Sequence, residues 1–466
     1  MKQLHILIPL LVLLSSGCEK ISVEPYIMPS FGNIYATMTE PYTYKFSTSV
    51  FSDKINECGF YCSESASMLN AKKYPSNLSG NSFSSVITLI GEGKKYYVCA
   101  YVSNGRTEIC SEIKDITVSG NSSWADSLLP SANAYIIPFP GRYSFTAVKG
   151  NSMTSVGDAA SAEVLWESYG TSKTITKGSL IKSVSLTGTM LKTVIFETNP
   201  VYQKGNAVIA VKDASGTVLW SWHIWLTDEP NRHTYNNNAG IMMDRNLGAT
   251  SAIPGDVGVL GLLYQWGRKD PFLGSSSINS TAEAKSTITW PSAVTSSSST
   301  GNLSYANAHP TTFITYNSEN SDWYYTGGSS TEIARWQSSK TIYDPCPAGW
   351  RVPDGGKLGV WSKAFSTSSG WNSEYNWDSA NNGMDLSGTD RKLGQSGPIW
   401  YPAPGYRNSS NGRLSGVGSN GFYWSVSPYD LYAYGLNFYI NSNDVIIFPA
   451  GYYNMAGGLS IRCIKQ

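Results

Sequence analysis

The sequence predicts a mostly β protein made of several domains. The chain has 466 residues, which is too long for one hydrophobic core, so about two to four domains are expected. Its 30 tyrosines, 15 tryptophans and 44 glycines favour short strands joined by many turns. Charged residues form only 14% of the chain and its net charge is +1, without a run of like charges. A nucleic-acid partner needs clustered lysines and arginines, so we expect none.

The N-terminus, residues 1–18, has the pattern of a secretory signal. Lys2 supplies positive charge, and Leu4–Leu14 is apolar but too short to span a bilayer. Small residues then precede Cys18 and resemble a bacterial lipobox, whose cysteine is acylated, although Ser15 stands where that pattern prefers leucine. An ordinary signal peptide is the alternative. We expect an exported protein of the outer membrane or cell surface that touches the membrane only by its N-terminal lipid, in a compartment that permits disulfides.

Residues 21–120 have the pattern of short strands with turns. In the stretch IGEGKKYYVCAYV, the apolar Ile90 is followed by Gly93 and then by Tyr96. This spacing resembles the tyrosine corner of fibronectin type III sandwiches. The resemblance implies an N-terminal β-sandwich that acts as a spacer, and a ligand-binding role for it is the alternative.

Four cysteines lie in this N-terminal region. Asn104-Gly105 predicts a hairpin with two loop residues, and counting back from it places Cys99 directly opposite Cys110. That arrangement permits a cross-strand disulfide between them. Cys58 and Cys62 lie four apart in a predicted strand, too far to bridge each other, and their pairing is left open. With no C-x-x-C pair and no histidine nearby, these four cysteines predict no metal site.

Residues 122–230 continue as a β-rich region. The last predicted strand in it alternates large apolar residues on one face, and the sequence allows two interpretations. We favour the buried seam between two packed layers, and a sugar-stacking platform is the alternative. The opposite face includes His223. The alternating residues are Val218, Trp220, Trp222, Ile224 and Leu226.

Residues 231–466 combine a Ser/Thr-rich loop at 274–304, a weakly helical stretch at Leu358–Phe365 and many short strands. The chain has no G-x-S-x-G elbow, no paired histidines and no Walker spacing, so no motif for catalysis or for a cofactor emerges. The triplet Glu229-Pro230-Asn231 and the stretch DSANNGMD, which starts at Asp378, carry oxygen ligands. Neither has the spacing of a calcium loop, and we favour solvated turns and no metal.

Cys346 and Cys463 are the only cysteines after Cys110. In an exported domain with two cysteines, a disulfide between them is expected. It would close a loop of 463 − 346 = 117 residues, which contributes about 4–5 kcal/mol in the chain-entropy model. The segment YDPCPAGWRVPDG around Cys346 is therefore predicted to be a structural clasp.

The stretches DPCPAGWRVPD, MDRNLGAT, WSVSP and LSIRCIK together resemble the Fibrobacter succinogenes major paralogous domain family, in the form found in Bacteroidetes surface lipoproteins. The resemblance covers the chain from about Ala134 to the C-terminus, although Ala134 stands where relatives have cysteine. It implies a C-terminal α+β domain with the C-type-lectin-like fold shared with formylglycine-generating enzymes. Those oxidases need free cysteines, and a Cys346–Cys463 bond would leave none in this domain. The resemblance therefore implies a surface role without that activity.

The predicted function is non-catalytic binding at the cell surface, to glycan or to a host surface or matrix protein, as an adhesin or a fimbrial tip component that contacts fimbrial subunits. A structural pilus subunit, a polysaccharide-capture protein and a glycoside hydrolase are the alternatives. Two tripeptides, at Asp126 and Asp378, resemble O-glycosylation acceptors. Ligand and assembly state are left open. Aromatic residues between the two clasp cysteines are the candidate ligand contacts: Trp371, Trp377, Trp400, Tyr401 and Tyr406.

Overall fold

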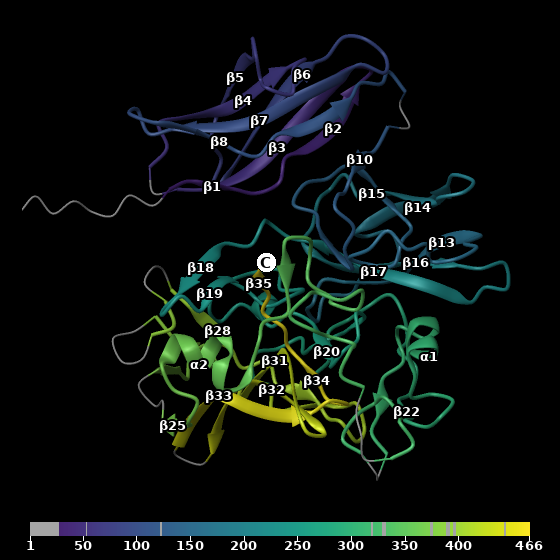
Figure 1. The fold of residues 1–466 in the computed structure, drawn as a ribbon, viewed down its shortest axis with the longest axis vertical. Helices are drawn as coiled ribbons and strands as arrows, with labels where there is room; N and C mark the ends of the chain where they lie inside the picture. The colour runs from purple at the N-terminus through teal and green to yellow at the C-terminus, as the bar shows by residue number, and fades with distance from the viewer. Residues whose placement is uncertain are drawn as a thin grey trace, which may run out of the picture.

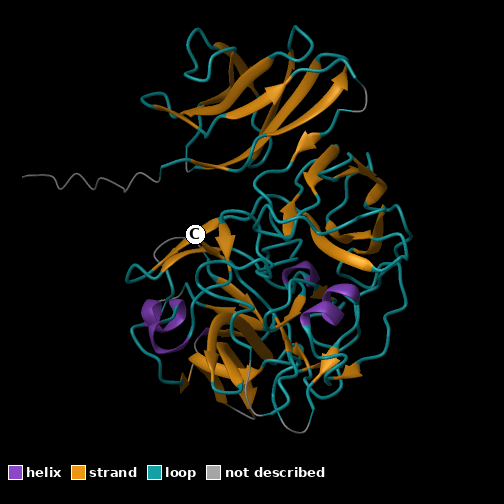
Figure 2. Ribbon diagram, turned by 45° about the vertical axis from the view of Figure 1, so that its right-hand side comes forward, coloured by secondary structure: helices purple, strands orange, loops and turns teal. Residues whose placement is uncertain are grey.

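The computed structural model describes residues 28–52, 54–121, 124–317, 320–328, 332–372, 376–387, 392–394, 398–441 and 444–466. The signal segment with Cys18 lies outside the described residues. Strands dominate this part of the chain, and its only α-helices are the short α1 (Leu303–Ala308) and α2 (Val360–Phe365) (Figure 2). The predicted mostly β fold is confirmed, and α2 falls within the stretch predicted to be helical. Two 3₁₀ turns are η1 (Val257–Val259) and η2 (Gly356–Leu358).

An N-terminal sandwich of two antiparallel sheets lies at the top of Figure 1. Its core buries Phe46, Phe60 and Phe83 between the sheets. The Tyr96 hydroxyl donates a hydrogen bond to the Ile90 carbonyl at 3.1 Å, so the predicted tyrosine corner is present. One sheet contains β1 (Ser30–Phe31), β2 (Tyr35–Glu40), β3 (Thr43–Phe51) and β6 (Ser82–Thr88). The other contains β4 (Glu57–Ser63), β5 (Lys72–Ser76), β7 (Lys95–Ser103), β8 (Glu108–Cys110) and β9 (Lys114–Thr117).

The predicted register of the β7–β8 hairpin is wrong. Ser103 pairs with Glu108, so residues 104–107 connect the strands, and Cys110 lies opposite Tyr101 instead of Cys99. The cause is the Asn104 side chain, whose Oδ1 accepts from the Arg106 and Thr107 amides at 2.9 Å each and so lengthens the turn. Cys99 and Cys110 are free thiols in the structure.

The middle region contains two further sheets, one of which is buried on both faces. Its strand β17 (Val218–Leu226) directs Trp220 and Trp222 into the layer between these two sheets, which confirms the predicted seam. On the other face, Trp225 packs into a core that also contains C-terminal residues. The buried sheet is β11 (Ala134–Ile136), β17, β16 (Gly205–Lys212) and β13 (Ser161–Ser168); the other is β10 (Asp126–Ser127), β12 (Arg142–Thr146), β15 (Thr193–Thr198) and β14 (Ile181–Thr187).

The C-terminal region is an array of small sheets around that shared core (Figure 1). The predicted Ser/Thr-rich loop holds only one short strand before α1 begins. The sheets are β18 (Arg232–Tyr235), β19 (Gly240–Met243), β35 (Ile464–Lys465) and β24 (Trp350–Arg351); β21 (Pro271–Phe272), β20 (Leu263–Gln265), β34 (Gly458–Leu459), β29 (Tyr406–Arg407) and β30 (Leu414–Ser415); β22 (Val294–Thr295) and β23 (Ile314–Thr315); β25 (Trp371–Asn372), β33 (Asp444–Asn454), β32 (Tyr432–Asn441) and β31 (Asn420–Tyr429); and β26 (Trp377–Asp378), β27 (Gly383–Asp385) and β28 (Trp400–Pro402).

The predicted disulfide between Cys346 and Cys463 is present, with both residues fully buried. Asp344 organises the Pro-rich segment, because its carboxylate accepts from the Cys346 and Val352 amides at 2.9 Å each. Asn133 of the middle region donates to the Asp344 carbonyl at 2.8 Å. The clasp segment is thus bonded both to the end of the chain and to the middle sheets.

The sandwich joins the rest of the chain through buried polar contacts. The Ala36 amide donates to the Asp126 carboxylate at 2.9 Å, and a Cβ placed on Gly32 would lie 3.0 Å from Cγ of Glu229. Oε2 of Glu229 makes no hydrogen bond within the described residues. Burial raises the pKa of Glu229 to about 7, against the opposing effect of Arg232 and Arg245.

This junction should weaken as the pH rises. Folded Glu229 keeps its proton up to about pH 7, whereas the unfolded carboxyl loses it near its ordinary value of 4.5. The stability that the proton provides is therefore complete below the unfolded pKa and is lost as the pH rises through the folded pKa. Glu229→Gln should flatten this dependence in urea unfolding followed between about pH 4 and about pH 8. An unchanged pH dependence in the variant would show that Glu229 is not the group responsible.

Candidate functional site

Two of the predicted ligand contacts, Trp400 and Tyr401, lie in the protein core on β28. The Tyr401 hydroxyl lies 2.6 Å from the Tyr235 hydroxyl and accepts from the Trp361 indole at 3.0 Å. The guanidinium of Arg462 lies over the Tyr401 ring, 3.7 Å from its centroid. These contacts occupy the Tyr401 hydroxyl and a face of its ring, and burial of both residues removes them from contact with a ligand at the surface.

The other three predicted contacts are half-buried and pack against core residues. Trp371 meets the ring of Phe365 on α2 at 4.9 Å between centroids, and Trp377 lies 6.4 Å from the Phe438 ring. Tyr406 stacks on Phe422 at 5.2 Å. The five predicted residues therefore do not form a common surface. Their position between the clasp cysteines in the sequence could not distinguish side chains that face the core from side chains that face the solvent.

A different aromatic group forms an exposed surface on the sheet of β31, β32 and β33. Four side chains, Tyr429, Tyr432, Tyr434 and Tyr452, make up this tyrosine platform. Tyr429 pairs in register with Tyr432, and Tyr434 pairs with Tyr452, so the four rings share one face of the sheet. Ring centroids are 4.7 Å apart for Tyr429 and Tyr434, 4.9 Å for Tyr429 and Tyr452, and 5.4 Å for Tyr432 and Tyr452. Tyr429 is 43% exposed and Tyr452 is 50% exposed.

The platform is held by the backbone beneath and beside it. A two-residue turn at Asp430-Leu431 joins β31 to β32, and Asp430 adopts a positive φ of 52°. Beside the sheet, a Cβ placed on Gly356 would lie only 3.0 Å from the Tyr434 ring, so a glycine there lets the segment approach closely. The opposite face packs Ala433 and Val426 into the shared core. A rigid strand scaffold therefore fixes the spacing of the rings.

The phenol groups of the platform are hydrogen-bonding groups, and the pKa of one of them, Tyr434, is raised. Partial burial raises the pKa of Tyr434 above its usual 10.0, and the neighbouring Tyr429 and Tyr452 raise it further. Each ring therefore offers an apolar face together with a hydroxyl that can donate and accept. Such a surface suits an uncharged ligand that has both apolar faces and hydroxyl groups.

The sequence contains a recognisable pattern for this platform, which lies before Cys463. The stretch SPYDLYAYG places tyrosines two apart on one strand and across a tight turn, at 429, 432 and 434. Period-two spacing puts alternate residues on the same face. Pairing with the strand that contains Tyr452 could not be read from the sequence, because it depends on a second hairpin with its own register shift.

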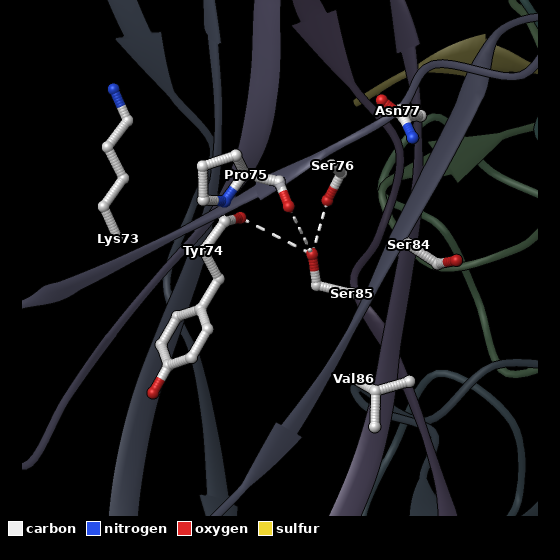
Figure 3. A pocket seen from close by; sticks show the side chains of 8 residues that line it. All are labelled: Lys73, Tyr74, Pro75, Ser76, Asn77, Ser84, Ser85 and Val86. Atoms are coloured by element: carbon white, nitrogen blue, oxygen red, sulfur yellow. Dashed lines mark hydrogen bonds between the residues drawn. The ribbon is translucent and has the colours of Figure 1, made fainter.

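The sandwich has a pocket of about 420 Å³ between β5 and β6, each of which is the edge strand of its sheet (Figure 3). Ser85 Oγ lies 2.5 Å from Ser76 Oγ and 3.4 Å from the Pro75 carbonyl, which links the two edges. Pro75 lacks an N–H and Lys73 is charged, and both features oppose the addition of another strand. The residues that line the pocket therefore protect the two sheet edges from pairing with another strand.

A buried cluster of Ser221, Lys269 and Asp270 has the composition of a serine nucleophile with a base. Lys269 Nζ donates to Ser221 Oγ at 2.5 Å and to the Asp270 carboxylate at 2.7 Å. Ser221 is 1%, Lys269 2% and Asp270 3% exposed, so a substrate has no atom of the cluster to reach. The Lys269 and Asp270 charges are paired with each other inside the core, and Ser221 hydrogen-bonds to both.

The oxygen-rich stretches noted in the sequence organise turns or pack at interfaces. Asp378 Oδ1 accepts from the Ala380 amide at 3.0 Å and from the Asn381 amide at 3.1 Å. Within the described ranges, His, Cys, Asp and Glu form no group of three or more that could hold a metal ion. In the same part of the chain, no helix combines the length and apolar character needed to cross a membrane.

No protein-family model and no curated protein matches the chain. It is similar in part to the solved titin domains Z1Z2 in complex with telethonin, with 11% identity over 44% of this chain and 100% of that chain, at a TM-score of 0.15. It is also similar to the FN1–FN3 domains of chicken CNTN1, with 12% identity, 46% and 75% coverage and a TM-score of 0.17. A marsupial T cell receptor gives 7% identity, 42% and 99% coverage and a TM-score of 0.18. Structural similarity at these TM-scores is too weak to assign a fold, so the fold is assigned from the strand order described above.

Removing a platform ring should cost little stability, whereas removing a core ring should cost much. We expect Tyr452→Ala to lower the free energy of unfolding by less than about 1 kcal/mol, because half of its surface is already in water. Tyr401→Ala should cost about 3–5 kcal/mol through the cavity it leaves. Guanidinium unfolding followed by tryptophan fluorescence compares the two variants. Equal losses would mean that Tyr452 is a structural residue.

Proposed function

We propose that this chain is a non-catalytic, exported protein that binds glycan through the tyrosine platform. The observation that supports this most is the set of four tyrosines from three strands on an exposed face, in which each ring centroid lies 4.7–5.4 Å from that of at least one other ring. Exposed aromatic patches of this kind mark interaction sites. A pyranose ring has an apolar C–H face bordered by hydroxyls, which matches ring faces bordered by phenol groups.

The remaining features fit the same proposal. The lipobox-like segment before Cys18 suggests attachment to the outer membrane or cell surface, and the sandwich would act as the spacer. The resemblance of the C-terminal region to the major paralogous domain family supports a surface role. Low charge content favours a neutral ligand over an acidic one. A host or fimbrial protein is the second candidate ligand, because tyrosine-rich surfaces also bind proteins.

A glycan array probed with the soluble chain, and titration calorimetry with the best oligosaccharide, test this proposal. Tyr429→Ala and Tyr452→Ala should each weaken binding about tenfold, which corresponds to about 1.4 kcal/mol per ring. Tyr42→Ala is the matched control, because Tyr42 is an exposed tyrosine on the sandwich (37% exposed) and its loss should leave affinity unchanged.

Two results would contradict the proposal. The first is glycan binding that survives both platform substitutions. The second is turnover of the bound oligosaccharide that one Asp or Glu substitution abolishes, because the protein would then be a hydrolase. If the array is empty and a platform-dependent protein ligand is found instead, the glycan proposal fails and the protein-binding alternative replaces it.

A further inference from the structure

Cys99 and Cys110 lie together beside a pocket of about 410 Å³ on the sandwich. Cys110 is exposed at the end of β8, whereas Cys99 on β7 is only 4% exposed. Interaction between the two neighbouring thiols shifts the pKa of both. Met68, Ala71 and Ile113 line the same pocket and give it an apolar wall.

Cys99 and Cys110 are diagonal neighbours across the β7–β8 pair, next to a register change. Tyr101 pairs with Cys110, but three residues back on β7, Val98 pairs with Lys114, so one extra residue is accommodated between β8 and β9. Such bulges redirect side chains and interrupt pairing. Cys99 faces this interruption, which leaves its thiol a diagonal neighbour of Cys110.

The four free cysteines of the described residues differ in their readiness to react. The hydrogen bond from Cys99 lowers the pKa of Cys110 to about 7, and Lys73 lowers it slightly, against burial and Glu108. The same hydrogen bond and burial raise the pKa of Cys99. Cys58 and Cys62 are buried, and burial raises the pKa of Cys62 to about 11. Because the thiolate is the nucleophile, Cys110 is the reactive cysteine of this set.

We propose that Cys110 and Cys99 form a dithiol site that undergoes exchange with low-molecular-weight disulfides. The Cys110 thiolate attacks one sulfur of R–S–S–R, forming a mixed disulfide and releasing one thiolate, R–S⁻. Cys99 then gives up its proton and attacks the Cys110 sulfur, which forms the Cys99–Cys110 bond and releases the second R–S⁻. Two protein thiols are oxidised and one small disulfide is reduced to two thiols. The apolar wall of the pocket receives the organic group R.

The site differs from the Cys346–Cys463 disulfide, which is fully buried and structural. An accessible thiolate beside a less accessible partner is the arrangement in which a mixed disulfide forms and is then resolved. The inference is independent of the tyrosine platform, which lies on another region of the chain. It holds or fails whether or not the protein binds glycan.

Ellman's reagent, an aromatic disulfide whose released thiolate absorbs visible light, tests the proposal on the native full chain. The wild-type protein, with Cys18 acylated or replaced by serine, should release two thiolates per chain, and intact-mass spectrometry should show the loss of two hydrogens without a retained adduct. Cys99→Ser should release one thiolate and keep the aromatic group on Cys110. Cys110→Ser should react at least about tenfold more slowly, because the remaining free thiols of the described residues, Cys58, Cys62 and Cys99, are buried.

The pair Cys99→Ser and Cys99→Ala separates the reactive role of Cys99 from its hydrogen bond. Both variants should trap the adduct, but the serine can still donate a hydrogen bond to Cys110 and the alanine cannot. The alanine variant should therefore react more slowly near neutral pH and show its rate increase at higher pH. A retained adduct on Cys110 of the wild-type protein would overturn the proposal. So would equally fast reaction of Cys110→Ser in a sample whose thermal unfolding matches that of the wild type.

Discussion

The clasp around Cys346 is the constraint on which the C-terminal two-thirds of the molecule depends. Its disulfide joins the Pro-rich segment to the last residues of the chain, and both sulfur atoms lie in the core. The Asp344 carboxylate accepts a hydrogen bond from the Cys346 amide within the segment, and the Asn133 side chain donates one to the Asp344 carbonyl, which joins the segment to the middle sheets. Closing a loop of this length removes many conformations from the unfolded chain, which stabilises the folded state. The polar contacts then determine which packing the closed loop adopts.

A consequence of this arrangement is that the middle and C-terminal regions share one hydrophobic core. Trp166 and Trp225 of the middle region pack in the same cluster as both clasp cysteines. A rigid core of this kind suits a binding surface, because the side chains on its outer strands lose little entropy when a ligand binds. The tyrosine platform lies on such strands, with Ala433 and Val426 behind it.

The sequence was most informative where a local pattern determines structure. Residue spacing predicted the tyrosine corner, the buried face of β17 and the helical stretch near α2, and the composition predicted the mostly β fold. The cysteine count, together with the expectation of export, predicted the clasp. The hairpin register failed because one asparagine side chain lengthened the turn, which shifted Cys110 by two positions. The prediction of exposed aromatic residues failed for a different reason: Tyr401 and Tyr452 each stand next to another aromatic residue in a short strand, and only long-range packing buries the first and exposes the second.

Hydrogen exchange in increasing denaturant tests the central claim most directly. The amides to follow are that of His223, bonded to the Asn133 carbonyl, and that of Met243, bonded to the Cys463 carbonyl. If the clasp holds one shared core, both amides should open in a single cooperative step. Replacing both clasp cysteines with serine should then lower both opening free energies together, by about 4–5 kcal/mol. Unchanged protection at His223 beside a large loss at Met243 would show two independent cores and contradict the account.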